Sequence, residues 1–335
     1  MITASAAAPQ PRWQALWRAA ITDPAVLLRR LGLEPLLTTL PADAAGFALR
    51  VPEGFVARMR HGDARDPLLL QVLPQLAETQ PHAAALQDAV GDAAARAATG
   101  VIHKYHGRAL LIASGACAVH CRYCFRRHFP YADETAAANH WQSALEWLQR
   151  HPEVDELILS GGDPLALTTA KLTELTDALR ALPQLRRLRI HTRLPVVLPQ
   201  RVDDELSAWL AALSWPVAIV LHSNHPAELD TTVATACDRL RRSGAQLLNQ
   251  AVLLKGINDD ADTLAMLSAR LFEMGVLPYY LHQLDRVQGA MHFEVSDEHA
   301  LALIATLRTR LPGYLLPRLV REQAGAAAKT PLAAP

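Results

Sequence analysis

The hydrophobic pattern of the chain changes near residue 108. Before this point, apolar residues recur at helical spacing, as at Trp13, Leu16 and Trp17, and prolines interrupt the pattern repeatedly. After it, short apolar runs alternate with amphipathic stretches at intervals of roughly 30 residues, which is the pattern of β-strand and α-helix units on a parallel sheet. The pattern therefore predicts a helical N-terminal region followed by an α/β core.

Seven apolar runs are strand candidates, and the stretches between them are helix candidates. Strands are expected at Ala109–Ser114, Glu156–Ser160, Arg187–His191, Val217–His222, Leu247–Leu253, Tyr279–Gln283 and Tyr314–Val320. Helices are expected at Trp141–Arg150, Lys171–Leu182 and Thr263–Met274, among others. Six or seven such units favour a partial or complete parallel (βα) barrel over an open sheet. We therefore expect a helical region at 1–100, a barrel core at 101–320 and a tail at 321–335.

Polar residues follow these strands at their carboxyl ends, where the catalytic groups of a parallel barrel gather. They are the cysteine segment 117–124, Ser160–Pro164, His191–Arg193, His222–His225, Gln250 and Gln283–Asp285, in the order of the strands. The sequence thus predicts that side chains spread over about 170 positions meet in one pocket.

Composition narrows the possible partners. Of the 335 residues, 50% are apolar and 20% charged, and 33 Lys and Arg balance 33 Asp and Glu, so no general field attracts nucleic acid or an anionic membrane. No apolar run of about 18 residues and no secretory signal is present, which predicts a cytoplasmic protein without a membrane span. A small-molecule ligand or a specific protein partner is expected.

Cys117, Cys121 and Cys124 lie within eight residues, which is the spacing of metal ligands rather than of disulfides in a chain this long. Three thiolates at this spacing can bind three irons of a [4Fe–4S] cubane and leave the fourth iron without a protein ligand. An open iron is suited to binding a small molecule.

The clustered cysteines have one alternative interpretation as metal ligands. A structural zinc loop would use His120 or His128 as its fourth ligand, but the second cysteine pair that many zinc modules carry is missing. The fourth cysteine, Cys237, falls in a helical stretch and is expected in the core.

The segment Cys-Ala-Val-His-Cys-Arg-Tyr-Cys after the first strand of such an array resembles the radical S-adenosylmethionine (SAM) superfamily. The resemblance implies that SAM binds the open iron and is cleaved to a 5′-deoxyadenosyl radical. Gly161, Gly162 and Asp163 follow the second strand, where glycines permit a close approach of backbone to ligand. Alone they are as consistent with a plain turn as with a ligand site, whereas the resemblance implies that they receive the methionine end of SAM.

Further segments resemble the lysine 2,3-aminomutase family, over roughly residues 100–331. They are Cys124–Arg127, Thr192–Arg201, His222–Pro226, Asn249–Asp259, Pro278–Asp285 and Lys329–Pro331. The resemblance implies an isomerase that converts L-α-lysine into (R)-β-lysine, with SAM and pyridoxal 5′-phosphate (PLP) as cofactors.

The resemblance also implies roles for single residues. Lys329, by itself a tail lysine, would form the Schiff base with PLP. Arg108 and Lys104 would lie near the PLP phosphate, with Arg108 better suited because a guanidinium fork binds phosphate through two bonds. His222 and Gln250 would contact SAM.

For the substrate, the resemblance implies that Arg126 binds the carboxylate and that Asp285 and Glu322 bind the side-chain ammonium. Two acids in a closed pocket repel one another unless a cation lies between them. Glu322 stands where the family has aspartate and His282 where tyrosine is frequent, which bears on affinity for free lysine.

The short C-terminus resembles the aminomutase of the elongation factor P β-lysylation pathway. Lysylated elongation factor P or its ligase would then be a partner, with a one-electron reductant such as flavodoxin. Two alternatives stay open. An aminomutase for another amino acid, such as glutamate, would suffer repulsion from Asp285 and Glu322. A non-catalytic iron–sulfur protein for electron transfer or sensing would leave Lys329 and Arg126 idle.

Overall fold

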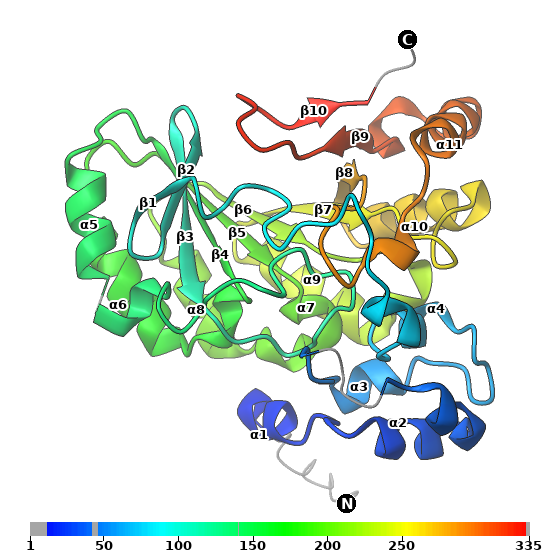
Figure 1. Cartoon of the computed structure of the whole chain (residues 1–335). Helices are drawn as coiled ribbons and strands as arrows, with labels where there is room; N and C mark the ends of the chain where they lie inside the picture. The colour runs from blue at the N-terminus through cyan, green and yellow to red at the C-terminus, as the bar shows by residue number, and fades with distance from the viewer. Residues whose placement is uncertain (1–11, 42–45, 140, 333–335) are drawn as a thin grey trace, which may run out of the picture.

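The computed structural model describes residues 12–41, 46–139 and 141–332 and contains one ten-stranded sheet (Figure 1). Neighbouring strands follow one another in chain order. The strands are β1 (Arg96–Ala98), β2 (Val101–Tyr105), β3 (Arg108–Ser114), β4 (Glu156–Gly161), β5 (Arg187–Thr192), β6 (Val217–Leu221), β7 (Gln246–Val252), β8 (Leu277–His282), β9 (Arg318–Arg321) and β10 (Thr330–Pro331). Strands β3 to β9 are parallel, and antiparallel pairs β1–β2, β2–β3 and β9–β10 form the two edges.

A helix follows each of the parallel strands β3 to β8. These helices are α5 (Gln142–Gln149), α6 (Thr169–Leu179), α7 (Leu194–Val197) with α8 (Asp204–Ala211), α9 (Thr231–Arg242), α10 (Ala261–Glu273) and α11 (Asp297–Arg310). Five of them begin at a side chain that accepts a hydrogen bond from the first turn, which satisfies a free amide there. The caps are Thr168, Asp203, Asp230, Asp260 and Ser296.

The predicted parallel α/β fold is confirmed, and among the described strands the barrel is partial, because pairing ends at β1 and β10. The six central strands lie within two residues of their expected limits. The seventh prediction was wrong at its start: residues Gly313–Leu315 form a 3-10 turn, and the strand begins at Arg318. The edge strands β1, β2 and β10 were missed because they are short and partly polar.

The N-terminal region contains α1 (Trp13–Arg18), α2 (Pro24–Leu31), α3 (Glu53–Val56) and α4 (Pro67–Leu70), none longer than eight residues. Figure 1 shows these helices at one end of the molecule and the β9–β10 hairpin at the other. One buried apolar cluster extends from Trp13 through the sheet to Leu319, so the region shares its core with the barrel. The division at residue 100 stays a prediction; it falls in the turn between β1 and β2.

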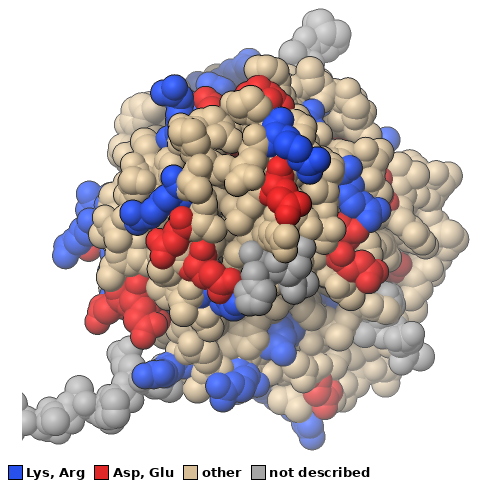
Figure 2. Space-filling model, turned by 90° about the vertical axis from the view of Figure 1, so that its left-hand side faces the viewer, with Lys and Arg blue, Asp and Glu red and all other residues tan. Residues whose placement is uncertain are grey.

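Two surface properties of the described residues bear on the sequence expectations. Basic and acidic side chains are interleaved on the face shown in Figure 2. No helix in the described ranges is long and apolar enough to cross a membrane.

Cys237 lies on α9, fully buried as expected, and burial raises its pKa to about 12.

Candidate active site

The three clustered cysteines lie on the loop that leaves β3, and the N-terminal region holds this loop. The Cys124 amide donates to the Cys121 carbonyl at 3.0 Å, which closes a tight turn. Between them, the Arg122 amide donates to the Gln71 carbonyl at 2.8 Å, and the Arg122 Nε donates to Glu78 Oε1 at 2.8 Å in a fully buried ion pair. The helices before residue 100 therefore fix the position of the cysteines.

The thiols suit a polynuclear iron centre. Burial, followed by the neighbouring Cys124 and Asp163, raises the pKa of Cys117 well above its ordinary value. Burial and then Cys121 raise the pKa of Cys124 to about 11. Three neighbouring thiolates repel one another, so ionisation of all three thiols is unfavourable without a cation. The irons of a cluster provide the positive charge. Each cysteine of a cubane binds a different iron, so the thiols need not converge on one point.

The zinc interpretation finds no support in the geometry. Within the described ranges, no three His, Cys, Asp or Glu side chains are grouped to hold a single metal ion. The two candidate fourth ligands are engaged elsewhere. His120 Nδ1 donates to the Ala48 carbonyl at 2.7 Å, and its ring stacks on Phe47. His128 Nε2 donates to the Gln288 carbonyl at 3.1 Å.

Gly161 and Gly162 bring the end of β4 against the start of the cysteine loop. Gly161 has φ +123°, and a Cβ there would lie 2.3 Å from the Ser114 carbonyl oxygen. The Gly162 amide donates to the same oxygen at 2.7 Å, and a Cβ on Gly162 would lie 2.6 Å from the Ala116 oxygen. No larger residue fits here. The glycine pair thus shapes the loop, and the proposed contact with SAM is a second role for the same bare backbone.

Asp163 binds the protein itself. Its carboxylate accepts hydrogen bonds from Thr192 Oγ1 at 2.8 Å and from the amides of Arg193 and Leu194 at 2.8 and 3.1 Å. Burial raises the pKa of Asp163 to about 6, although these donors oppose the shift. The carboxylate therefore joins the ends of β4 and β5, and its predicted role in cofactor binding would be to orient this rim.

A chain of alternating charges connects both predicted ends of the substrate site. Arg126 Nε lies 2.7 Å from Asp92, and the other Asp92 oxygen lies 2.6 Å from Lys104 Nζ. The Lys104 ammonium also donates to Glu322 Oε1 at 3.0 Å, and Glu322 Oε2 accepts from Lys329 at 2.7 Å. Five charged residues from distant segments are thus in direct contact. Asp92, which joins Arg126 to Lys104, was not predicted from the sequence.

Asp285 lies within the electrostatic reach of this charge chain. Its Oδ1 is buried and accepts no hydrogen bond from the described residues. Burial, and then the charge of Glu322, raises the pKa of Asp285 to about 7, against the opposing influence of Lys329 and Lys104. A buried unpaired carboxylate beside a second acid is a site for a cation that comes from outside.

Neutral histidines line the carboxyl ends of β5, β6 and β8. Burial lowers the pKa of His222 to about 3 and holds the pKa values of His191 and His282 well below the usual range, with Lys329 contributing to each. The Gln250 amide donates to the unprotonated His222 Nε2 at 2.9 Å. Three further atoms, Gln250 Oε1 and the Nε2 atoms of His191 and His282, are buried and have no partner among the described residues. Such atoms fit polar cofactors such as SAM and PLP.

Arg108 offers a further unpaired donor. Its guanidinium lies 4.8 Å from the Tyr105 ring centre, and its Nε is buried without an acceptor among the described residues. Lys104, by contrast, is surrounded by three oxygens, because the Val90 carbonyl accepts from it at 2.8 Å in addition to Asp92 and Glu322. An ammonium has three protons. Arg108 is therefore the better placed of the two for a phosphate.

Curated relatives match nearly the whole chain. An L-lysine 2,3-aminomutase of Escherichia coli (strain K12) is 48% identical over 314 residues, which are 93% of this chain and 92% of the relative. The chain belongs to the L-lysine 2,3-aminomutase family. The enzyme of the same name from Haemophilus influenzae is 45% identical over 322 residues, covering 96% and 95% of the two chains. That of Clostridium subterminale is 34% identical and covers 81% and 65%.

Residues 106–188 also match the family described as a 4Fe-4S single cluster domain. This matched range contains all three clustered cysteines. Membership in the aminomutase family and this match make the protein an isomerase of the radical SAM type, with a [4Fe–4S] cluster, SAM and PLP as cofactors. A solved radical SAM methyltransferase from Sphaerobacter thermophilus is similar at a TM-score of 0.46 and 18% identity, over 66% of this chain and 68% of the other.

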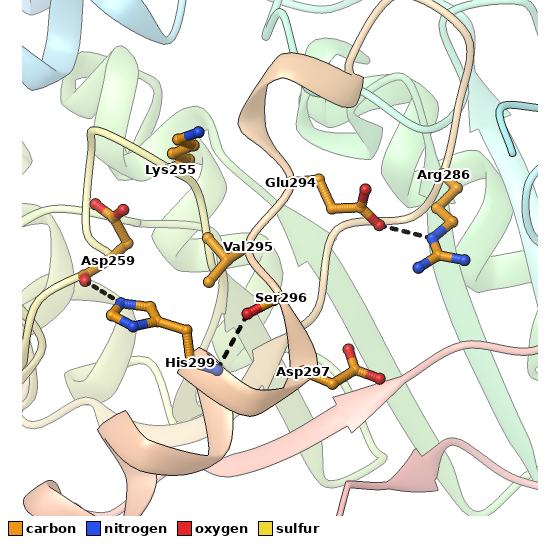
Figure 3. Close-up of a pocket in the computed structure, with 8 residues that line it drawn as sticks. All are labelled: Lys255, Asp259, Arg286, Glu294, Val295, Ser296, Asp297 and His299. Carbon is orange, nitrogen blue, oxygen red and sulfur yellow. Dashed lines mark hydrogen bonds and ion pairs between the residues drawn. The ribbon is translucent and has the colours of Figure 1, made fainter. Parts of the chain in front are cut away.

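One surface pocket lies apart from the predicted aminomutase site residues. It has a volume of about 620 Å³, and its lining includes Arg286, Glu294, Asp259 and His299 (Figure 3). Arg286 and Glu294 are paired at 2.7 Å, and His299 Nε2 donates to the Asp259 carbonyl at 2.9 Å. None of the predicted site residues lines it. A smaller cavity of about 150 Å³ instead borders Arg126 and Asp92.

Proposed function

We propose that the protein converts L-lysine into (R)-β-lysine by moving the amino group from the α-carbon to the β-carbon. The observation that carries this proposal is the buried Asp285 Oδ1, which has no hydrogen-bond partner among the described residues and lies under the influence of the Glu322 charge. A terminal ammonium is the ligand that two such acids require. Several relatives that cover most of this chain bear the name L-lysine 2,3-aminomutase, which supports the same substrate.

Arg126 supplies the opposite anchor. Its Nε and Nη1 atoms donate to Asp92 and to Ser160 at 2.7 and 3.1 Å, so the buried guanidinium is held rigidly. Among the described residues, none accepts a hydrogen bond from its Nη2, which leaves N–H groups for a substrate carboxylate. A carboxylate at Arg126 and an ammonium at Asp285 define the two ends of one lysine molecule.

The Lys329–Glu322 contact provides an exchange of cations. While Lys329 is free, its ammonium occupies Glu322 Oε2. Were Lys329 bound to PLP, this donor would be withdrawn, and Glu322 and Asp285 would be left to hold the substrate ammonium. Lys104 stays on Glu322 Oε1 and limits the repulsion between the acids. Lys329 and the substrate ammonium would therefore compete for Glu322 Oε2.

When bound, the cluster with SAM supplies a 5′-deoxyadenosyl radical, and PLP supplies a conjugated ring that delocalises the substrate radical. The protein's part is to fix the lysine β-carbon in position. Two charged anchors at opposite ends restrict both translation and rotation, and alignment of this kind contributes about 7–11 kcal/mol in well-oriented reactions. The neutral His222, hydrogen-bonded to Gln250, presents polar atoms without adding charge.

In the cell, we place this reaction in the cytoplasm, in the β-lysylation of elongation factor P, with a flavodoxin-type reductant. Glutamate fits the site poorly, because its side-chain carboxylate would meet Asp285 and Glu322. A non-catalytic iron–sulfur protein would not need the chain of charged side chains that extends from Arg126 to Lys329.

A panel of substrates tests the proposal anaerobically with reconstituted protein. L-Lysine should be converted, whereas norleucine lacks the ammonium, lysinamide lacks the carboxylate, and L-glutamate carries the wrong charge. We expect loss of at least about 2 kcal/mol of binding for each missing anchor, or roughly 30-fold in kcat/KM. Conversion of norleucine or glutamate as fast as lysine would refute the assigned acidic end.

A further inference from the structure

Arg193 lies beside the cysteine loop although it follows β5, 72 residues after Cys121 in the chain. Its Nη1 donates a hydrogen bond to the Cys121 Sγ at 2.7 Å. The side chain is buried, with 7% of its surface exposed. A permanently charged guanidinium therefore contacts one of the three sulfurs that would bind the cluster.

The other side of the guanidinium is firmly fixed. Its Nη2 donates to Gln71 Oε1 at 2.7 Å and to Glu228 Oε2 at 3.0 Å. The rings of Phe55 and Tyr123 each lie 5.6 Å from the guanidinium carbon. These contacts come from the N-terminal region, the cysteine loop and the turn after β6, so Arg193 connects three parts of the protein at the sulfur.

Glu228 is itself held in place, which prevents it from drawing Arg193 away. Its Oε1 accepts from the amides of Asn224 and His225 at 2.9 and 3.1 Å and from Gln71 Nε2 at 3.2 Å. Arg58 donates to the Glu228 carbonyl from the far side and lies 3.7 Å from Asp230. The position of Arg193 is thus determined by a buried network that binds both of its Nη atoms.

We infer that Arg193 sets the reduction potential of the cluster through its hydrogen bond to Cys121. The oxidised cluster takes one electron from a low-potential one-electron donor, and the added charge is spread over the irons and sulfurs. A donor and a positive charge at a cluster sulfur stabilise the reduced state more than the oxidised state, so the potential rises. Arg193 is a positioning and tuning residue that need not contact the substrate.

This role rests on cysteine ligation of the cluster and is independent of the identity of the amino-acid substrate. The test uses reconstituted protein, with the reduced cluster followed by electron paramagnetic resonance during a potentiometric titration with dithionite. Arg193→Gln should shift the midpoint to a more negative value. Arg193→Lys retains a charge but loses the fork, and its midpoint should lie between those of the wild type and Arg193→Gln.

Arg58→Gln is the matched control, because it removes a guanidinium from the same network without removing a donor from sulfur. Its midpoint should equal that of the wild type. Arg193→Gln also leaves Glu228 buried and unpaired, which can destabilise the protein. The double variant Arg193→Gln/Glu228→Gln removes that cost, and its midpoint should still be more negative. The inference would be overturned if the double variant contained its full complement of iron and still had the midpoint potential of the wild type.

Discussion

Lys329 donates a hydrogen bond of 2.7 Å to Glu322 across the two ends of the β9–β10 turn. Antiparallel pairing places Thr330 opposite Arg321, so the next residues on either side, Lys329 and Glu322, face each other. The hairpin therefore delivers the predicted PLP lysine and a predicted substrate acid to the same point. Its position at the last parallel strand brings both to the carboxyl ends of the sheet.

Replacement of Lys329 by alanine should abolish the visible Schiff-base absorbance of PLP and leave the cluster spectrum unchanged. The two cofactors are expected to depend on different residues, Lys329 on the hairpin and the cysteines on the β3 loop. Absorbance after addition of PLP to the reconstituted variant is the measurement. Lys255→Ala is the control, because Lys255 is exposed and lines the separate surface pocket. A retained band in Lys329→Ala would transfer the Schiff base to Lys104 or Lys255.

Asp285→Asn should lower kcat/KM for lysine by roughly 30- to 1000-fold, since loss of one partner of a buried charge pair costs about 2–4 kcal/mol. Lysine binding needs the ionised carboxylate, whose pKa burial raises to about 7. Wild-type kcat/KM should therefore rise as the pH passes upward through about 7. The same profile in Asp285→Asn would contradict the assignment.

The raised pKa of Asp285 has a second consequence for the ligand-free protein. Its folded value of about 7 lies above the ordinary 3.8, so the folded state binds this proton more tightly than the unfolded chain. Ionisation therefore costs stability as the pH rises from about 4 to about 7. Thermal unfolding at pH 5 and pH 8 should differ less in Asp285→Asn than in the wild type. An equal difference would show that Asp285 does not carry the shift.

Lys104→Met should affect the substrate end more than PLP binding. The Lys104 ammonium contacts Asp92 and Glu322, and its charge lowers the pKa of Asp285. Its loss should move the pH midpoint of kcat/KM upward, while the dissociation constant of PLP changes by less than about threefold. Arg108→Met is the comparison and should weaken PLP by about tenfold or more, as expected for loss of a charge-assisted bond. Equal weakening of PLP by both variants would place Lys104 on the phosphate.

The fold and the cysteine centre could be predicted because they depend on local patterns. Apolar runs at regular intervals specify parallel strands, and three cysteines on one loop specify a cluster wherever the loop lies. Asp92 could not be found in this way, because it stands in a turn outside all of the strands that the sequence predicts. Only the folded chain brings Asp92 to Arg126 and Lys104.

Arg193 illustrates a similar limit. Its segment was recognised as a polar strand end, yet its contact with Cys121 depends on the packing of Gln71 and Glu228 from distant segments. Asp163 shows the reverse case, in which a residue next to a glycine pair was assigned to a cofactor while its oxygens accept from backbone amides and Thr192. Sequence identifies the rim of the site, and the packing of the rim decides which atoms remain free.

Gly162→Ala should reduce iron incorporation and destabilise the protein by about 1–3 kcal/mol, because its Cβ would lie 2.6 Å from the Ala116 oxygen in the cysteine loop. Gly54→Ala is the matched control, since Gly54 lies in α3 with open space around its Cβ position and should gain about 0.4–1 kcal/mol. Iron content and thermal unfolding measure both effects. Full cluster loading in Gly162→Ala would contradict the close packing of β4 on the loop.

The most direct test of the central claim is anaerobic turnover of the reconstituted protein with L-lysine, SAM, PLP and dithionite, followed by chromatography of the amino acids. Formation of β-lysine by the wild type, and none by Cys121→Ala, is the predicted result. Absence of β-lysine from a protein that still cleaves SAM to 5′-deoxyadenosine would contradict lysine as the substrate.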